Sequence, residues 1–86
     1  MSVGALKLQV LYFAHAQELA GIAEEPVEVP PGSTVRDVVQ TLEERHPSLA
    51  ELLGRSRFAV DQEFATLDDA IVREGEFAVI PPVSGG

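Results

Sequence analysis

The sequence contains no cysteine, and only two of its 86 residues are histidines. The absence of cysteine excludes disulfides, thiolate metal sites, iron–sulfur clusters and a cysteine nucleophile. His15 and His46 fall in different predicted elements and lack the spacing of two ligands on one helix face, so we expect no metal site. These absences leave little chemistry for a catalytic centre within the chain.

Long apolar runs and basic residues are also scarce. The apolar stretches fall far short of the ~20 residues that a membrane helix needs, and the first residues lack the pattern of a secretion signal. Fourteen acidic residues against six basic ones give a net charge of −8, which repels phosphate backbones and anionic lipid. We therefore expect a cytoplasmic protein with no nucleic acid and no membrane among its partners.

Motifs of known enzyme sites are missing as well. No serine stands in a Gly-x-Ser-x-Gly context, and the sequence has no glycine-rich phosphate loop. The acidic residues from Asp61 to Asp69 lack the spacing and the glycine of a calcium loop. The sequence favours a binding or carrier role, with no bound cofactor.

Residues 5–14 alternate apolar and polar side chains and predict a first strand, whose second face turns apolar at Leu11 and Phe13. That end of the strand is expected to be central, and either covered on both sides or set beside a partner surface. Residues 27–29 predict a second strand, and Pro26 confines it to an edge. The two strands most simply form a hairpin.

One long helix is predicted to start at Thr34. The Thr34 side chain can accept a hydrogen bond from the amide of Asp37, and the Asp37 carboxylate can answer back to the cap. Pro47 ends the helix near His46. An apolar stripe follows the helical period: Val35, Val38, Val39 and Leu42.

The rest of the domain is predicted to contain a short helical turn at 48–54, strands at 57–60 and 64–67, a turn at Gly75 and a last strand at 77–80. The whole reads as an α+β domain over residues 1–80, with the helix packed across one face of a mixed sheet. The apolar first and last strands are expected to lie side by side at its centre.

Residues 81–86 form a distinct uncharged segment. Pro81 and Pro82 have no amide hydrogen, so they direct the chain out of the sheet and stiffen it. Gly85 and Gly86 have no side chains and leave the terminal carboxylate accessible. We expect an extended arm that can thread a channel of another protein; the alternative is a frayed terminus.

The stretches "VLYFAHAQELAG" (10–21) and "FAVIPPVSGG" (77–86) resemble the small subunits of molybdopterin synthase, the MoaD-type sulfur carriers. The resemblance covers residues 6–86 and implies the ubiquitin-like β-grasp fold, with about five strands, one main helix and a free C-terminal arm. Two terminal glycines alone are shared with other ubiquitin-like carriers.

The resemblance implies a mechanism for the arm. An E1-like adenylyltransferase would use ATP to adenylate Gly86, and a sulfur donor such as a cysteine desulfurase or a rhodanese-like protein would convert it to a thiocarboxylate, a C-terminal 1-thioglycine. The arm would then enter the large synthase subunit, where the sulfur attacks cyclic pyranopterin monophosphate (precursor Z) to form molybdopterin. Two small and two large subunits are implied, with the catalytic pocket on the large one.

Within this interpretation, Gly86 and Gly85 are the reactive end, and Pro81, Pro82, Val83 and Ser84 contact the partner's channel. Apolar residues around Phe13 and Phe77 form a possible docking surface, with Phe58, Phe64 and Val79 nearby. Core packing would explain most of these side chains equally well.

Three other functions remain open. A sister carrier could supply sulfur to thiazole (thiamine) or cysteine synthesis or to tRNA thiolation. A ubiquitin-like modifier could become attached to lysines of other proteins, although Lys7 is the single lysine on which it could build chains of itself. A passive β-grasp binding module would have an incidental Gly-Gly end.

Overall fold

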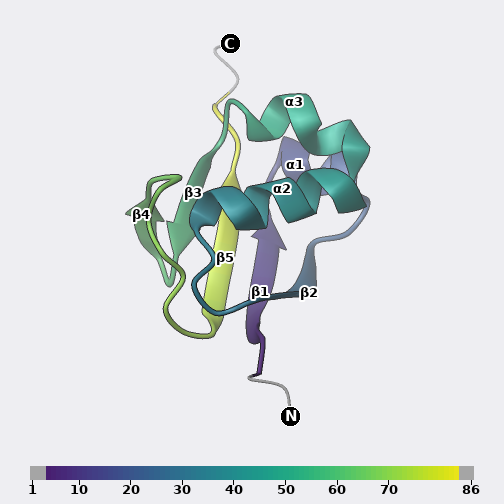
Figure 1. The fold of residues 1–86 in the computed structure, drawn as a ribbon. Helices are drawn as coiled ribbons and strands as arrows, with labels where there is room; N and C mark the ends of the chain where they lie inside the picture. Colours follow the sequence, from purple (N-terminus) through teal and green to yellow (C-terminus); the bar gives the residue numbers. More distant parts are fainter. Residues whose placement is uncertain (1–3, 84–86) are drawn as a thin grey trace.

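The computed structural model describes residues 4–83, which form an α+β domain of strands and helices. The strands form a five-stranded mixed sheet in the order β2-β1-β5-β3-β4, and α2 crosses one face of it (Figure 1). This confirms the predicted fold class. The elements are β1 (Leu6–Tyr12), α1 (His15–Ala20), β2 (Glu24–Val29), α2 (Val35–Arg45), the 3₁₀ helix η1 (Pro47–Leu49), α3 (Ala50–Leu53), β3 (Arg57–Val60), β4 (Glu63–Ala65) and β5 (Gly75–Ile80).

The first and last strands lie at the centre of the sheet, as predicted. β1 pairs in parallel with β5, with Val10 opposite Phe77, and antiparallel with β2. β2 is an edge strand and contains Pro26, which lies opposite Gln9 and cannot donate to a ladder. The predicted hairpin of the first two strands is therefore confirmed, although β2 begins three residues earlier than expected.

Helix α2 follows the predicted pattern closely. The amide of Asp37 donates to Thr34 Oγ1, and the Asp37 carboxylate accepts from the Thr34 amide at 2.9 Å, which completes the capping box. The apolar stripe from Val35 to Leu42 is buried against the sheet. Each such side chain contributes about 1.5–3 kcal/mol on full burial, so packing rather than helix propensity holds the helix in place.

The core fills the space between α2 and the covered face of the sheet. It also includes side chains from α1, α3 and η1, which lie beside α2 over the same face (Figure 1). Its largest fully buried members are Tyr12, Phe77, Leu8, Leu42, Leu49, Leu53 and Ile71.

The last strand begins at Gly75, so the prediction of a turn at this residue is wrong. Gly75 lies opposite Leu8 in the central ladder, and the chain bends at residues 73–74 instead. A Cβ on Gly75 would sit 2.2 Å from Asp61 Oδ1, an atom that accepts the amide of Glu76 at 3.0 Å. The glycine is needed for this close approach of a side chain and not for a turn.

Candidate functional site

The sheet face opposite α2 is the candidate site. In β1, Leu8 and Val10 are buried under the helices, so Gln9 and Leu11 point to the other side. Side-chain direction alternates in the same way in β5 and β3: Phe77 and Phe58 belong to the core, whereas Ala78 and Ala59 line the other side. We call this side the open face, because no helix within residues 4–83 covers it (Figure 1).

Apolar side chains gather on one half of the open face. Phe13 and Phe64 are 47% and 67% exposed, and the cluster surrounds a hollow of about 360 Å³ that Gln62 and Glu76 also line. Exposed aromatic side chains grouped in this way are typical of protein interaction sites. The open-face patch, as we name it, consists of Leu11, Phe13, Ala59, Phe64, Ala78 and Ile80.

The predicted arm leaves the domain at this patch. β5 ends at Ile80, a patch residue, and because β1 and β5 run parallel both strands end at the same side of the sheet. Pro81 is partly buried, whereas Pro82 is exposed and Val83 is 92% exposed. Neither proline can donate a backbone hydrogen bond, which explains why the ladder stops here. Three further predicted site residues lie outside the described part of the chain: Ser84, Gly85 and Gly86.

Of the two residues predicted for a docking surface, Phe13 lies on the open-face patch, whereas Phe77 does not. Phe77 is fully buried, and its ring centroid lies 5.7 Å from that of Phe58 in the core. The prediction for Phe77 is wrong because its strand alternates: the side chains of Ala78 and Ile80 point to the open face, and those of Phe77 and Val79 to the helices.

Sequence reasoning missed two small residues of the patch, Ala59 and Ala78. They lie opposite each other in the β3–β5 ladder. Together they form the apolar floor of the patch, between its larger side chains. The one sequence signal was their position next to a phenylalanine in a predicted strand, which does not tell which of the two side chains faces the helices. An alanine has so little apolar surface that it does not stand out in a hydrophobic pattern.

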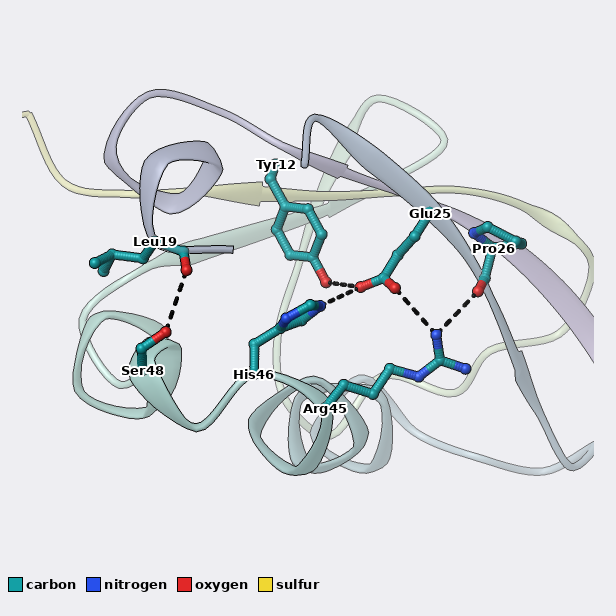
Figure 2. A network of polar contacts seen from close by, with 7 residues as sticks. All are labelled: Tyr12, Leu19, Glu25, Pro26, Arg45, His46 and Ser48. Carbon is teal, nitrogen blue, oxygen red and sulfur yellow. Dashed lines mark hydrogen bonds and ion pairs between the residues drawn. The ribbon is translucent and has the colours of Figure 1, made fainter. Parts of the chain in front are cut away.

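A polar cluster lies behind the same end of the sheet, on its covered side. Glu25 accepts hydrogen bonds from the Tyr12 hydroxyl at 2.5 Å, from His46 Nε2 at 2.7 Å and from Arg45 at 3.1 Å (Figure 2). Arg45 also donates to the carbonyl of Pro26. We call these residues the Glu25 network; it joins β1, β2 and the C-terminal end of α2.

Ionisation follows from these contacts. Burial alone raises the pKa of Glu25, but hydrogen bonds from Tyr12 and His46, the charge of His46 and the hydrogen bond from Arg45 outweigh it and hold the pKa below its ordinary value. Burial, together with the bond to Glu25, raises the pKa of Tyr12 far above its ordinary range. The network therefore holds an ionised carboxylate and a neutral phenol.

The described residues contain no candidate metal centre. His15 faces Glu18 at the surface and His46 faces Glu25, and residues 4–83 contain no group of three or more potential ligands able to hold a metal ion. In that same range no helix is long and apolar enough to cross a membrane. What residues 4–83 do present is an exposed apolar patch at the point where the chain leaves the sheet.

Comparison with known proteins agrees with this geometry. Residues 10–86 match the model of the ThiS family. The chain is 40% identical to the molybdopterin synthase sulfur carrier subunit of Homo sapiens, over 93% of this chain and 94% of that protein. It is 39% identical to the subunit of the same name in Arabidopsis thaliana, with 95% and 85% of the two chains covered.

Solved structures share the fold. The small archaeal modifier protein 1 of H. volcanii matches with a TM-score of 0.81 and 28% identity, over 91% of this chain and 99% of that one. Caldiarchaeum subterraneum ubiquitin matches with a TM-score of 0.64 and 17% identity over 96% of this chain and 100% of its own, which indicates a common fold alone. The expected ubiquitin-like β-grasp fold is confirmed.

Proposed function

The chain belongs to the ThiS family, and on this basis we propose that it is a sulfur carrier of molybdenum cofactor biosynthesis, the small subunit of a molybdopterin synthase. The near full-length similarity to sulfur carrier subunits of that enzyme supports the assignment. In the structure, the observation that supports it most directly is the position of the arm: the chain leaves the sheet beside an exposed apolar patch. A partner that covers the patch would receive the arm.

The chemistry resides in the terminal carboxylate of Gly86. A carboxylate is a poor electrophile until it has a leaving group, so an E1-like enzyme first adenylates it with ATP. The persulfide of a sulfur donor, such as a cysteine desulfurase or a rhodanese-like protein, then displaces AMP and forms an acyl disulfide. A thiol reductant cleaves its S–S bond, which releases the thiocarboxylate. Its sulfur attacks cyclic pyranopterin monophosphate and links the carrier to it as a thioester, which water hydrolyses so that the sulfur stays on the pterin and the carrier returns as a carboxylate. Two such transfers build the dithiolene.

The residues of the arm have separate roles in this proposal. Pro81 and Pro82 direct it away from the sheet and limit its flexibility. Val83 and Ser84 contact the walls of the partner's channel, and the 92% exposure of Val83 leaves its side chain accessible for this contact. Gly85 and the reactive Gly86 fit where a side chain would block the approach to the carbonyl carbon. Residues 1–80 act as the β-grasp domain and residues 81–86 as the arm.

The open-face patch docks on the large subunit, which holds the catalytic pocket. Phe13 and Phe64 are the exposed aromatic anchors of such a contact. The large subunit binds an anionic, phosphorylated pterin and is expected to be basic around it, which suits a partner of net charge −8. Two small and two large subunits would assemble in the cytoplasm.

Loading of the arm can be tested by intact mass spectrometry. After incubation with ATP, an E1-like activating enzyme and a sulfur source, the chain should gain the mass of one sulfur-for-oxygen exchange. A chain that lacks Gly86 is the matched control and should show no gain. An unchanged mass of the complete chain with cognate partners would contradict the proposal.

Docking can be tested separately by titration calorimetry with the large subunit. Phe13→Ala should weaken binding by about tenfold or more, as expected for an aromatic anchor. Gln9→Ala is the matched control, since Gln9 lies on the polar half of the same face. Equal affinities of the two variants would exclude the patch as the docking surface.

A second candidate function is attachment to other proteins as a ubiquitin-like modifier. The similarity to the small archaeal modifier protein 1 favours it. This function predicts bands of higher mass that contain the chain joined through Gly86 to lysines of other proteins. The carrier function predicts a free thiocarboxylate instead, so mass analysis of the chain recovered from cells separates the two.

A further inference from the structure

A second hollow lies between α2, the end of α3, and strands β3 and β4. These elements are neighbours in Figure 1, and the backbone amide of Arg36 donates to the carbonyl of Leu67, which ties the start of α2 to the segment after β4. The hollow has a volume of about 650 Å³. We call it the α2–β4 groove.

The floor of the groove is apolar and its rim is exposed. Val39 of α2, Leu53 of α3 and Phe58 of β3 are almost fully buried and form the floor. Phe64 and Leu67 stand at the rim, with 67% and 39% of their surfaces exposed. An apolar floor with an exposed apolar and polar rim is the arrangement in which one large side chain of a partner can be anchored.

The charges at the groove differ from those of the rest of the chain. Although acidic residues outnumber basic ones by fourteen to six in the sequence, the groove is lined by two arginines, Arg36 and Arg57, and one acidic residue, Glu43. The open-face hollow, in contrast, has Glu76 as its charged residue. Two guanidinium groups thus line one hollow of an acidic protein, and guanidinium groups attract carboxylates.

Both arginines are available to a carboxylate at small cost. Arg36 pairs with Asp68 at 2.7 Å, but the Asp68 side chain is 86% exposed, and an ion pair so open to water is worth little and exchanges readily. Arg57 lies over the ring of Phe64 at 5.2 Å. This contact uses the flat face of the guanidinium and none of its N–H donors, which can still form a paired hydrogen bond with a carboxylate.

We propose that the α2–β4 groove binds an acidic segment of a second protein, which inserts one apolar side chain over Val39, Leu53 and Phe58 and places carboxylates on Arg36 and Arg57. This surface goes beyond the proposed sulfur transfer and does not depend on it. The groove borders the open-face patch at Phe64, yet its floor belongs to the covered side of the sheet. A protein bound in the groove would therefore share Phe64 with one docked on the open-face patch.

The test uses two synthetic peptides and the ¹⁵N-labelled full chain. One peptide combines leucine with glutamate, and in the other every glutamate is replaced by lysine. In NMR titrations, the acidic peptide should shift the amide signals of Arg36, Val39, Ser56 and Thr66 and should bind about tenfold or more tightly than the basic one. Equal binding of the two peptides, no binding of the acidic one, or shifts confined to Leu11 and Ala78 would overturn the proposal.

Charge reversal provides the second measurement. Arg57→Glu and Arg36→Glu should each weaken binding of the acidic peptide by about tenfold. Arg73→Glu is the matched control, because Arg73 is an exposed arginine outside the groove, and it should leave the affinity within about twofold. The same spectra report whether each variant is folded. Full affinity of both groove variants would also overturn the proposal.

Discussion

Leu11 and Tyr12 are neighbours in the sequence, but they point to opposite sides of the sheet, into surroundings that differ in almost every physical respect. Tyr12 is 2% exposed, and its hydroxyl belongs to the Glu25 network, in which the donors find an acceptor within the chain. Leu11 belongs to the open-face patch, where Phe13 and Phe64 lie largely in water. The covered side is packed and hydrogen-bonded within the chain itself, whereas the open side leaves apolar side chains exposed to water.

The largest difference in stability is expected between alanine variants of two phenylalanines that lie on opposite sides of the sheet. Phe77→Ala removes a fully buried ring and should lower the free energy of unfolding by about 3–5 kcal/mol. Phe13→Ala, on the open face, should change it by less than about 1 kcal/mol. Urea unfolding followed by circular dichroism measures both. Similar losses in the two variants would mean that the open face is part of the core.

The Glu25 network should give the next largest effect. Glu25→Ala leaves the Tyr12 hydroxyl without its acceptor in a largely buried place, which costs about 1–3 kcal/mol. Glu24→Ala, one residue away, removes an exposed contact with Gln9 and should cost less than about 0.5 kcal/mol. Thermal unfolding of both variants at neutral pH provides the comparison, and equal losses would show that the network adds no stability.

Acidification should lower the free energy of unfolding through the Glu25 network on the covered side of the sheet. No matching loss is expected from the open face. Because the pKa of Glu25 is lower in the folded chain than in the unfolded one, its stabilisation is complete above the ordinary carboxylate pKa of about 4. The stabilisation is lost as the pH falls through the lower, folded-state pKa. Unfolding free energies measured from neutral to acidic pH should therefore fall less steeply in Glu25→Gln. Parallel curves for this variant and the native chain would contradict the assignment.

The smallest effect on stability, with a large effect on function, is expected from the arm. Gly85→Ala and Gly86→Ala should shift the free energy of unfolding by less than about 0.5 kcal/mol, since β5 ends at Ile80. Both variants should nevertheless impair sulfur loading or transfer, measured by the mass gain at the terminus. A marked loss of thermal stability in either variant would mean that the arm packs on the domain.

Local patterns predicted much of the fold. Helix α2 was predicted from three short-range signals: the capping box at Thr34, the apolar stripe and the proline that follows the helix. The predicted bounds are close to those observed. The alternation in β1 and the apolarity of both β1 and β5 correctly predicted that these strands are central. In these cases the residues that determine an element lie within the element itself or directly beside it in the sequence.

Other features depend on residues far apart in the chain. The Glu25 network brings together residues 12, 25 and 46, which no local pattern connects. The role of Gly75 follows from the side chain of Asp61, and that contact arises from the fold. Phe77 was misplaced for the same reason, because an apolar strand does not reveal which of its faces the helices will cover.

The parallel pairing of β1 with β5 has a consequence for how the protein is made. The strand at the sheet's centre is formed by residues 75–80, so a ribosome must release nearly the entire chain before β1 acquires its inner neighbour. Pairing across so long a separation is slow compared with the formation of a hairpin such as β1–β2. An incompletely synthesised chain would therefore expose the edge of β1 and lack the strand that places the arm. The sheet is thus complete only after residue 80, the last residue of its central strand, has been synthesised.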